Sequence, residues 1–181
     1  TKKLFQVGVR AFAKCISGRR FMAGSILDNK KILIVDDEED VLTVVEEEVL
    51  QASPNSKIYK TTNYEDAASF LNSEQYDLII LDIMGVRGFE LLQIAVNRKF
   101  KVVMLTAHAL SPEALKKSHD MGAMAYLPKD KLGEIVPFLE DVFQYDFKAG
   151  WKRLLEKLET TFSARFEPNW KKKTGLPYWY Y

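Results

Sequence analysis

The sequence predicts an α/β protein built on a doubly wound, five-stranded parallel sheet. Short apolar runs rich in branched residues recur along the chain, as in strands that helices cover on both faces. Segments with apolar residues at helical spacing separate these runs, which is the alternation expected of a parallel sheet. The most apolar runs, each of which ends on a polar or charged side chain, cover residues 31–35, 78–81, 101–105 and 123–127.

The run 78–81 is the most continuous of these and ends on Asp82. A residue at the carboxyl end of such a strand lies at the edge where open α/β sheets bind their ligands. Taken alone, Asp82 has two interpretations. It either carries function on a rigid support, or it caps the next helix or opens a turn.

The ends of the other strands favour the functional interpretation. The first predicted strand ends on Asp36 and Asp37, the fourth on Thr106 and the last on Lys129. In a parallel sheet these ends share one edge. Clustered carboxylates repel one another unless a cation joins them, and hard oxygen ligands suit Mg²⁺. The set therefore predicts a site for a phosphoryl group on Asp82, with its charge neutralised by Mg²⁺ and by the lysine.

In their order and approximate spacing, these motifs resemble those of the receiver domains of bacterial two-component response regulators. The resemblance covers residues 30–145 and implies the flavodoxin-like (βα)5 fold. The segments that carry it are Val35-Asp36-Asp37, Leu81-Asp82-Ile83-Met84, Leu105-Thr106-Ala107 and Tyr126-Leu127-Pro128-Lys129.

The resemblance implies a metal site as well as a phosphoacceptor. Asp82 would receive the phosphoryl group and would also bind Mg²⁺. Asp36 and Asp37 would be the other acids of the metal site, with Asp37 as a direct ligand. The backbone carbonyl of Met84 would complete the protein ligands.

The resemblance also implies a phosphoryl-binding and switching set. Thr106 and Lys129 would contact the phosphoryl oxygens, and Tyr126 would be the aromatic switch residue that turns inward as Thr106 moves. His108 has two interpretations. It would either face the phosphoryl group, as would Met84, and tune hydrolysis, or it is an exposed loop residue.

The first half of the predicted domain alternates regularly. Apolar residues at helical spacing, among them Val44, predict a helix over 38–50 whose glutamates stay in water. Residues 57–62 alternate as a more exposed strand, and residues 64–71 predict the second helix.

The second half continues this pattern with a helix at 89–97. A fourth helix is predicted to begin after the capping residue Ser111, with proline at its first position, and to run to Met121. We expect His119 on the surface of that helix. A fifth helix is predicted over 132–145, where Pro137 fits only in the first turn or at a bend.

Two loops depart from the family's usual pattern. No proline follows Asp82, and Gly88 comes about two residues early. Lys129 is preceded by Pro128 and followed by Asp130, whereas the family has proline directly after the lysine. The resemblance therefore implies no cis peptide bond here, and we expect Asp130 to cap the fifth helix.

The two ends of the chain are basic, whereas residues 30–145 carry twelve basic and twenty acidic side chains. Residues 1–29 form a basic extension that we expect to be poorly ordered. This extension is either a membrane-surface or targeting segment, or a segment upstream of a natural start at Met22, which we favour. The single cysteine, Cys15, excludes an intrachain disulfide, as suits a reducing cytoplasm.

Residues 146–181 predict an amphipathic helix followed by a basic and aromatic tail. We expect the helix to bury its apolar stripe against the receiver domain or against a second copy. Binding to a partner protein or to an anionic membrane is the alternative, and nucleic-acid binding is less favoured. The stripe consists of Phe147, Trp151, Leu154, Leu155, Leu158, Phe162 and Phe166.

The function that follows is a cytoplasmic, Mg²⁺-dependent phosphoacceptor switch. A sensor histidine kinase or a phosphotransfer protein would phosphorylate Asp82, and the changed surface would bind an output protein, with a homodimer left open. We expect no enzymatic activity beyond self-phosphorylation and autodephosphorylation. The alternatives are a phosphorylation-independent interaction module and a metal-dependent phosphohydrolase. The chain has no apolar run that is long enough to span a bilayer.

Overall fold

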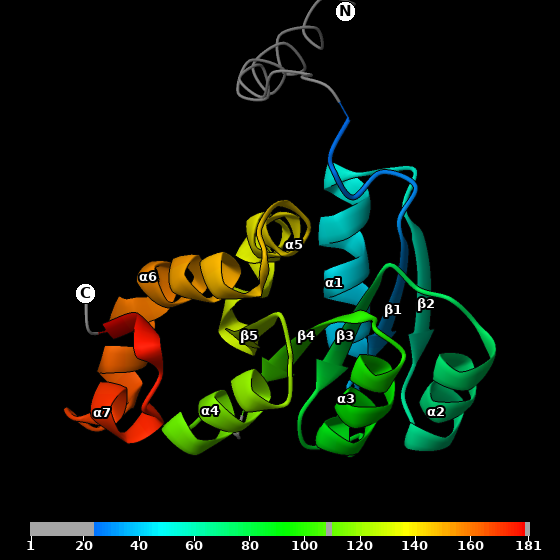
Figure 1. Ribbon diagram of the computed structural model, residues 1–181. Helices are drawn as coiled ribbons and strands as arrows, with labels where there is room; N and C mark the ends of the chain where they lie inside the picture. Colours follow the sequence, from blue (N-terminus) through cyan, green and yellow to red (C-terminus); the bar gives the residue numbers. More distant parts are fainter. Residues whose placement is uncertain (1–23, 108–109, 180–181) are drawn as a thin grey trace, which may run out of the picture.

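The computed structural model describes residues 24–107 and 110–179, which form a parallel sheet flanked by helices (Figure 1). The predicted sheet is confirmed, and its strand order is β2-β1-β3-β4-β5. The strands are β1 (Lys31–Val35), β2 (Lys57–Thr61), β3 (Leu78–Asp82), β4 (Lys101–Thr106) and β5 (Ala125–Pro128).

Helices cover both faces of the sheet. Helices α1 and α5 lie on one face, and α2, α3 and α4 lie on the other (Figure 1). The helices of the receiver fold are α1 (Glu39–Ala52), α2 (Tyr64–Ser73), α3 (Gly88–Asn97), α4 (Pro112–Asp120), the 3-10 helix η1 (Lys129–Glu134) and α5 (Ile135–Gln144). The C-terminal helices are α6 (Phe147–Arg165), α7 (Trp170–Thr174) and the 3-10 helix η2 (Pro177–Trp179).

The apolar runs explain the arrangement of the strands. Strand β3 is buried along its whole length between β1 and β4, as expected for a run without polar interruptions. Strand β2 lies at the edge and exposes most of its residues, which agrees with its alternating sequence. The pairing of Val35 with Leu81 and of Asp82 with Leu105 brings the ends of three strands together.

Two helix predictions need correction. Val44 is 39% exposed, because it lies between the core-facing positions of α1 rather than on its buried stripe. The predicted fifth helix is divided into η1 and α5. Pro137 is the third residue of α5, where its missing backbone N–H costs no intrahelical hydrogen bond.

The predicted N-terminal extension ends earlier than residue 29. Leu27 is fully buried in the core, and its carbonyl accepts a hydrogen bond of 2.8 Å from Ser56 Oγ. Ser25 Oγ donates to Glu140 Oε1 at 2.9 Å. Residues 24–29 therefore belong with the domain, whereas the interpretations of residues 1–21 lie outside the described residues.

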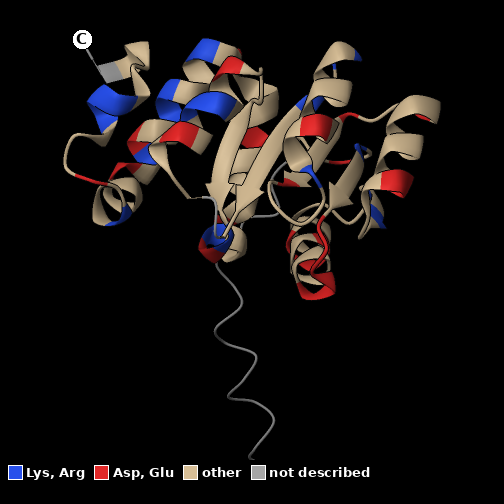
Figure 2. Ribbon diagram, turned by 90° about the horizontal axis from the view of Figure 1, so that it is seen from below, with Lys and Arg blue, Asp and Glu red and all other residues tan. Residues whose placement is uncertain are grey.

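The C-terminal extension, residues 146–179, packs against α4, β5 and α5, so the structure has the first of the expected arrangements. Trp151 is fully buried, and its Nε1 donates to the carbonyl of Ala123 at 2.8 Å. The five-residue helix α7 packs on α4. In Figure 2 many Lys and Arg positions, coloured blue, lie along the ribbon of these last helices, as the charge distribution of the sequence indicates.

This packing explains two further errors of prediction. His119 is half-buried rather than an exposed surface residue, because its ring lies 5.0 Å from that of Phe147 and 5.1 Å from that of Trp151. Asp130 caps no helix. Its carboxylate instead receives hydrogen bonds of 2.6 and 3.2 Å from the guanidinium of Arg165.

Within the described residues, no helix combines the length and the hydropathy needed to cross a bilayer.

Candidate functional site

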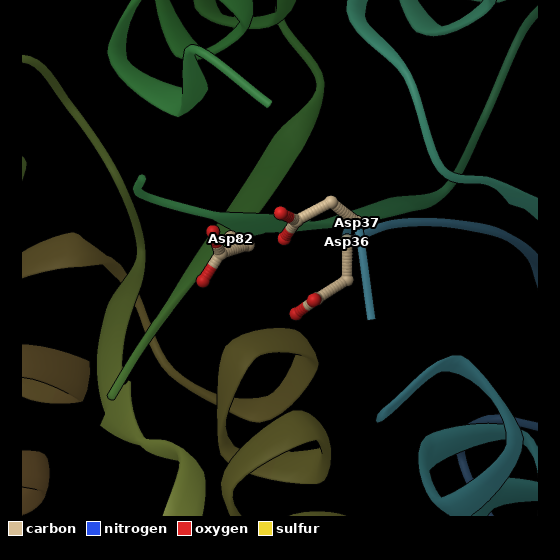
Figure 3. A group of neighbouring side chains, drawn as sticks. All are labelled: Asp36, Asp37 and Asp82. Carbon is tan, nitrogen blue, oxygen red and sulfur yellow. The ribbon is translucent and has the colours of Figure 1, made fainter. Parts of the chain in front are cut away.

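Three carboxylates meet at the carboxyl edge of the sheet, as predicted. Asp36 and Asp37 follow β1, and Asp82 ends the neighbouring strand β3 (Figure 3). One carboxylate oxygen from each residue lies within 4.8 Å of the other two. Asp36 and Asp82 are buried, while Asp37 is exposed at the mouth of the cluster. The cluster therefore has one side open to solvent.

Lys129 reaches the same cluster from the end of β5. Its Nζ lies 2.8 Å from Asp36 Oδ2 and 3.0 Å from Asp82 Oδ1. A third acid, Glu38, places its Oε1 2.7 Å from the same Nζ. Glu38 was not predicted as a residue of this site, although its position directly after Asp37 was the available signal.

The site holds more negative than positive charge. Burial raises the pKa of Asp36, and the nearby Asp82 carboxylate adds to this, while Lys129 opposes it. Burial lowers the pKa of Lys129, but the three acids outweigh burial and the net direction is upward. One ammonium group cannot balance four carboxylates, so a divalent cation would relieve the remaining repulsion.

Backbone amides fix the orientation of the Asp82 carboxylate. Its Oδ2 accepts hydrogen bonds from Met84 N at 2.9 Å and from Gly85 N at 2.8 Å. Its Oδ1 faces Lys129. The Met84 side chain is 66% exposed, which leaves it free to meet a partner or a ligand. The role of the Met84 carbonyl as a metal ligand stays a prediction.

The short loop after β3 depends on two glycines that pack closely. A Cβ at Gly85 would lie 2.0 Å from Asp37 Oδ1, and a Cβ at Gly88 would lie 1.9 Å from the carbonyl oxygen of Asp82. A side chain at either position would displace a site residue or the backbone of the loop. The loop after β3 therefore packs directly against Asp37 and the end of β3.

Thr106 and Tyr126 lie on neighbouring strands near the same edge of the sheet. Thr106 ends β4, Tyr126 lies in β5, and both are buried. Burial raises the pKa of Tyr126 to about 12, while the backbone of Ser111 and the side chain of Thr106 act against this rise. The Thr106 hydroxyl lies near the tyrosine but has no hydrogen bond of good geometry within the described part of the chain. His108 lies outside the described residues.

A family model described as the response regulator receiver domain matches residues 32–139. Two curated relatives come from Bacillus subtilis (strain 168). The transcriptional regulatory protein YvrH is 28% identical over 145 residues, which are 77% of this chain and 56% of that protein. The alkaline phosphatase synthesis transcriptional regulatory protein PhoP is 34% identical over 83 residues, which are 44% of this chain and 34% of that protein. The chain thus spans between about a third and just over half of these relatives' lengths.

Solved structures share the fold. The crystal structure of a response regulator from Thermotoga maritima aligns with a TM-score of 0.57 at 19% identity, covering 65% of this chain and 99% of that one. Identity at this level supports the architecture alone. The unmatched part of the chain includes α6 and α7, which lie beyond the residues of the family match.

Proposed function

The chain belongs to the family of response regulator receiver domains, and from this premise we propose that it is a phosphoacceptor switch. In this proposal Asp82 receives a phosphoryl group from a histidine kinase or a phosphotransfer protein. Members of the receiver family are signalling regulators rather than enzymes in the usual sense. The observation that carries the proposal is the contact of Lys129 with Asp82 and Asp36 inside a cluster of three carboxylates.

The transfer is a simple displacement. A carboxylate oxygen of Asp82 attacks the phosphorus of a phosphohistidine, a P–O bond forms, and the P–N bond breaks. The imidazole nitrogen leaves with the bonding electron pair. The amides of Met84 and Gly85 hold the carboxylate in position before the reaction, so little reorganisation is needed. In this proposal Lys129 and the Thr106 hydroxyl bind the oxygens of the transferred group.

The residues of the site fit Mg²⁺. Three carboxylates within reach of one another, one of them exposed, make the hard oxygen donor set that this ion prefers. Burial is the main cause that raises the pKa of Asp36, and repulsion from the Asp82 carboxylate adds to it. Asp36, Asp37, Asp82 and the Met84 carbonyl would hold the ion, which would supply positive charge to the carboxylates and to the phosphoryl oxygens.

Phosphorylation would act on a protein-interaction surface. Thr106 would move toward the new phosphoryl group, and Tyr126 would follow as a shift between two populated states. The site is open to solvent, as a kinase or phosphotransfer partner requires. We place this switch in the cytoplasm, where such a kinase presents its phosphohistidine, and we assign it no DNA-binding role.

The test is intact mass spectrometry after incubation with Mg²⁺ and acetyl phosphate. We expect one phosphoryl adduct on the wild type, none on Asp82→Asn, and loss of the adduct when EDTA is present from the start. Glu65→Gln removes an exposed carboxylate elsewhere and is the matched control, which should label like the wild type. A wild type that stays unlabelled, or an Asp82→Asn variant that labels normally, would contradict the proposal.

A further inference from the structure

The C-terminal extension covers the side of the domain that holds the predicted switch residue. Tyr126 is fully buried, and its ring centroid lies 6.2 Å from that of Phe162 in α6. Phe162 is itself fully buried. The tyrosine ring thus packs against the extension rather than facing solvent.

The hydroxyl end of the tyrosine side chain meets Thr106, at the edge of the sheet that carries the phosphoacceptor. The Thr106 side chain and the Ser111 backbone interact with the Tyr126 hydroxyl, and both lower its pKa against the effect of burial. Tyr126 therefore lies between the site and the extension. Its hydroxyl end faces Thr106 of the site, and its ring packs against Phe162 of the extension.

Phe162 is held by other aromatic residues of the extension. Its ring stacks on Phe166 with centroids 5.2 Å apart and meets Trp170 edge-on at 5.7 Å. Trp170 is buried, and its Nε1 donates to Ser163 Oγ at 3.3 Å. The position of Phe162 therefore depends on whether the end of α6 and the start of α7 are docked.

A second contact joins α6 to the loop that carries the lysine of the site. Arg165, the last residue of α6, makes a two-pronged ion pair with Asp130, which directly follows Lys129. The side chains of Arg165 and Asp130 are 43% and 44% exposed, so the pair contributes little to stability. Its effect is to place the end of α6 beside the loop after β5.

We propose that Phe162 is a positioning residue for the switch: it holds Tyr126 in the inward orientation, so that docking of the C-terminal extension and phosphorylation of Asp82 favour each other. This inference rests on the proposed function, because the resemblance to receiver domains associates the inward tyrosine with the phosphorylated state. The extension then acts as the part of the chain that responds to phosphorylation. Coupling of this kind is reciprocal. Docking of the extension raises the affinity of the site for a phosphoryl group by the same factor as the phosphoryl group raises the equilibrium constant for docking.

The experiment uses the full chain with Mg²⁺ and beryllofluoride, which imitates a phosphoryl group on aspartate. Fluorine NMR measures the affinity, and hydrogen exchange of peptides from residues 147–174 measures docking of the extension. We expect bound beryllofluoride to slow exchange in α6 and α7. We expect Phe162→Ala to weaken beryllofluoride binding about fivefold, the lower end of typical coupling.

Two further variants separate positioning from a structural role. Phe162→Leu keeps most of the apolar volume and should restore most of the affinity. Glu156→Ala changes the exposed face of α6 and should leave affinity unchanged. A merely structural role of Phe162 would lower the unfolding temperature of Phe162→Ala without changing the affinity of its folded fraction for beryllofluoride.

The outcomes distinguish this inference from the function on which it rests. Wild-type protein that binds beryllofluoride with unchanged or faster exchange in α6 and α7 would overturn the inference alone. Unchanged affinity in Phe162→Ala would do the same. If Phe162→Ala does not fold, Phe162→Leu and the exchange of the wild type decide the question. Wild-type protein that binds no beryllofluoride would overturn the proposed function, and the inference with it.

Discussion

The edge of the sheet around Asp82 and the face covered by the C-terminal extension are built on opposite principles. Among the described residues at the edge, four carboxylates lie around one lysine, and the Thr106 hydroxyl lacks a well-formed hydrogen bond. Under the extension, the side chains are aromatic and buried, and Trp151 Nε1 has a carbonyl partner. The unbalanced negative charge of the first region suits a cation, and its unsatisfied hydroxyl suits an anionic group held beside that cation. The second is mainly apolar and buried, and suits a structural contact that a switch can strengthen or weaken.

The largest effect should come from removing an aromatic anchor of the covered face. Trp151→Ala would leave a large cavity and an unpaired Ala123 carbonyl, so we expect the free energy of unfolding in urea to fall by about 4 kcal/mol. Trp151→Phe keeps most of the ring and should cost less than half of this. A loss below about 1 kcal/mol for Trp151→Ala would mean that the extension does not pack on the domain in solution.

The next largest effect should appear at the edge of the sheet around Asp82. Lys129→Ala removes the one cation in contact with Asp36 and Asp82 among the described residues, and we expect the rate of labelling by acetyl phosphate to fall about 100-fold or more. Lys131→Ala, two residues away, removes a lysine that pairs only loosely with Glu134 at 3.5 Å and is the matched control. Equal rates for the two variants would contradict the role of Lys129.

A smaller effect, a loss of stability at high pH, should come from Tyr126, which lies between the two regions. The folded-state pKa of Tyr126 is about 12, above its ordinary value near 10, so the folded protein keeps this proton longer than the unfolded chain. The contribution is fully present below pH 10 and is lost as the pH rises to about 12, which amounts to roughly 2 to 3 kcal/mol. The free energy of unfolding of the wild type should therefore fall over this pH range relative to that of Tyr126→Phe. The same pH dependence in both proteins would mean that the ring is not buried.

The smallest effect concerns the polar rim of the extension. Arg165→Ala removes the exposed ion pair with Asp130. We expect the free energy of unfolding to fall by no more than about 1 kcal/mol, the usual limit for exposed pairs. Lys152→Ala, on the exposed face of α6, should have no effect within error. A loss for Arg165→Ala as large as that for Trp151→Ala would show that the rim, rather than the aromatic core, holds the extension.

The two regions also differ in how far the sequence could predict them. Asp36, Asp82, Thr106 and Lys129 each lie at or directly after the end of a strand, so a parallel sheet brings them together whatever the loops do. The local pattern was therefore sufficient for the geometry of the acids and the lysine. The contact of Glu38 with Lys129 was missed because it depends on a side-chain conformation and not on a strand end.

The covered face could be predicted only in part. The apolar stripe of residues 147–166 predicts the helix, but no local feature of the sequence indicates which surface of the domain it contacts. His119 and Asp130 were misassigned for this reason, since their partners lie in the extension. The division of the last receiver helix at residue 135 follows from Pro137, which the sequence showed to be acceptable only in a first turn or at a bend.

The central claim is that Asp82, and not another acid of the cluster, carries the phosphoryl group. The most direct test is to reduce the phosphorylated wild type with borohydride, which converts an acyl phosphate to an alcohol, and to locate the product by peptide sequencing. The account predicts homoserine at position 82 alone. Homoserine at position 36 or 37, or no conversion in a protein that carries the adduct, would contradict it.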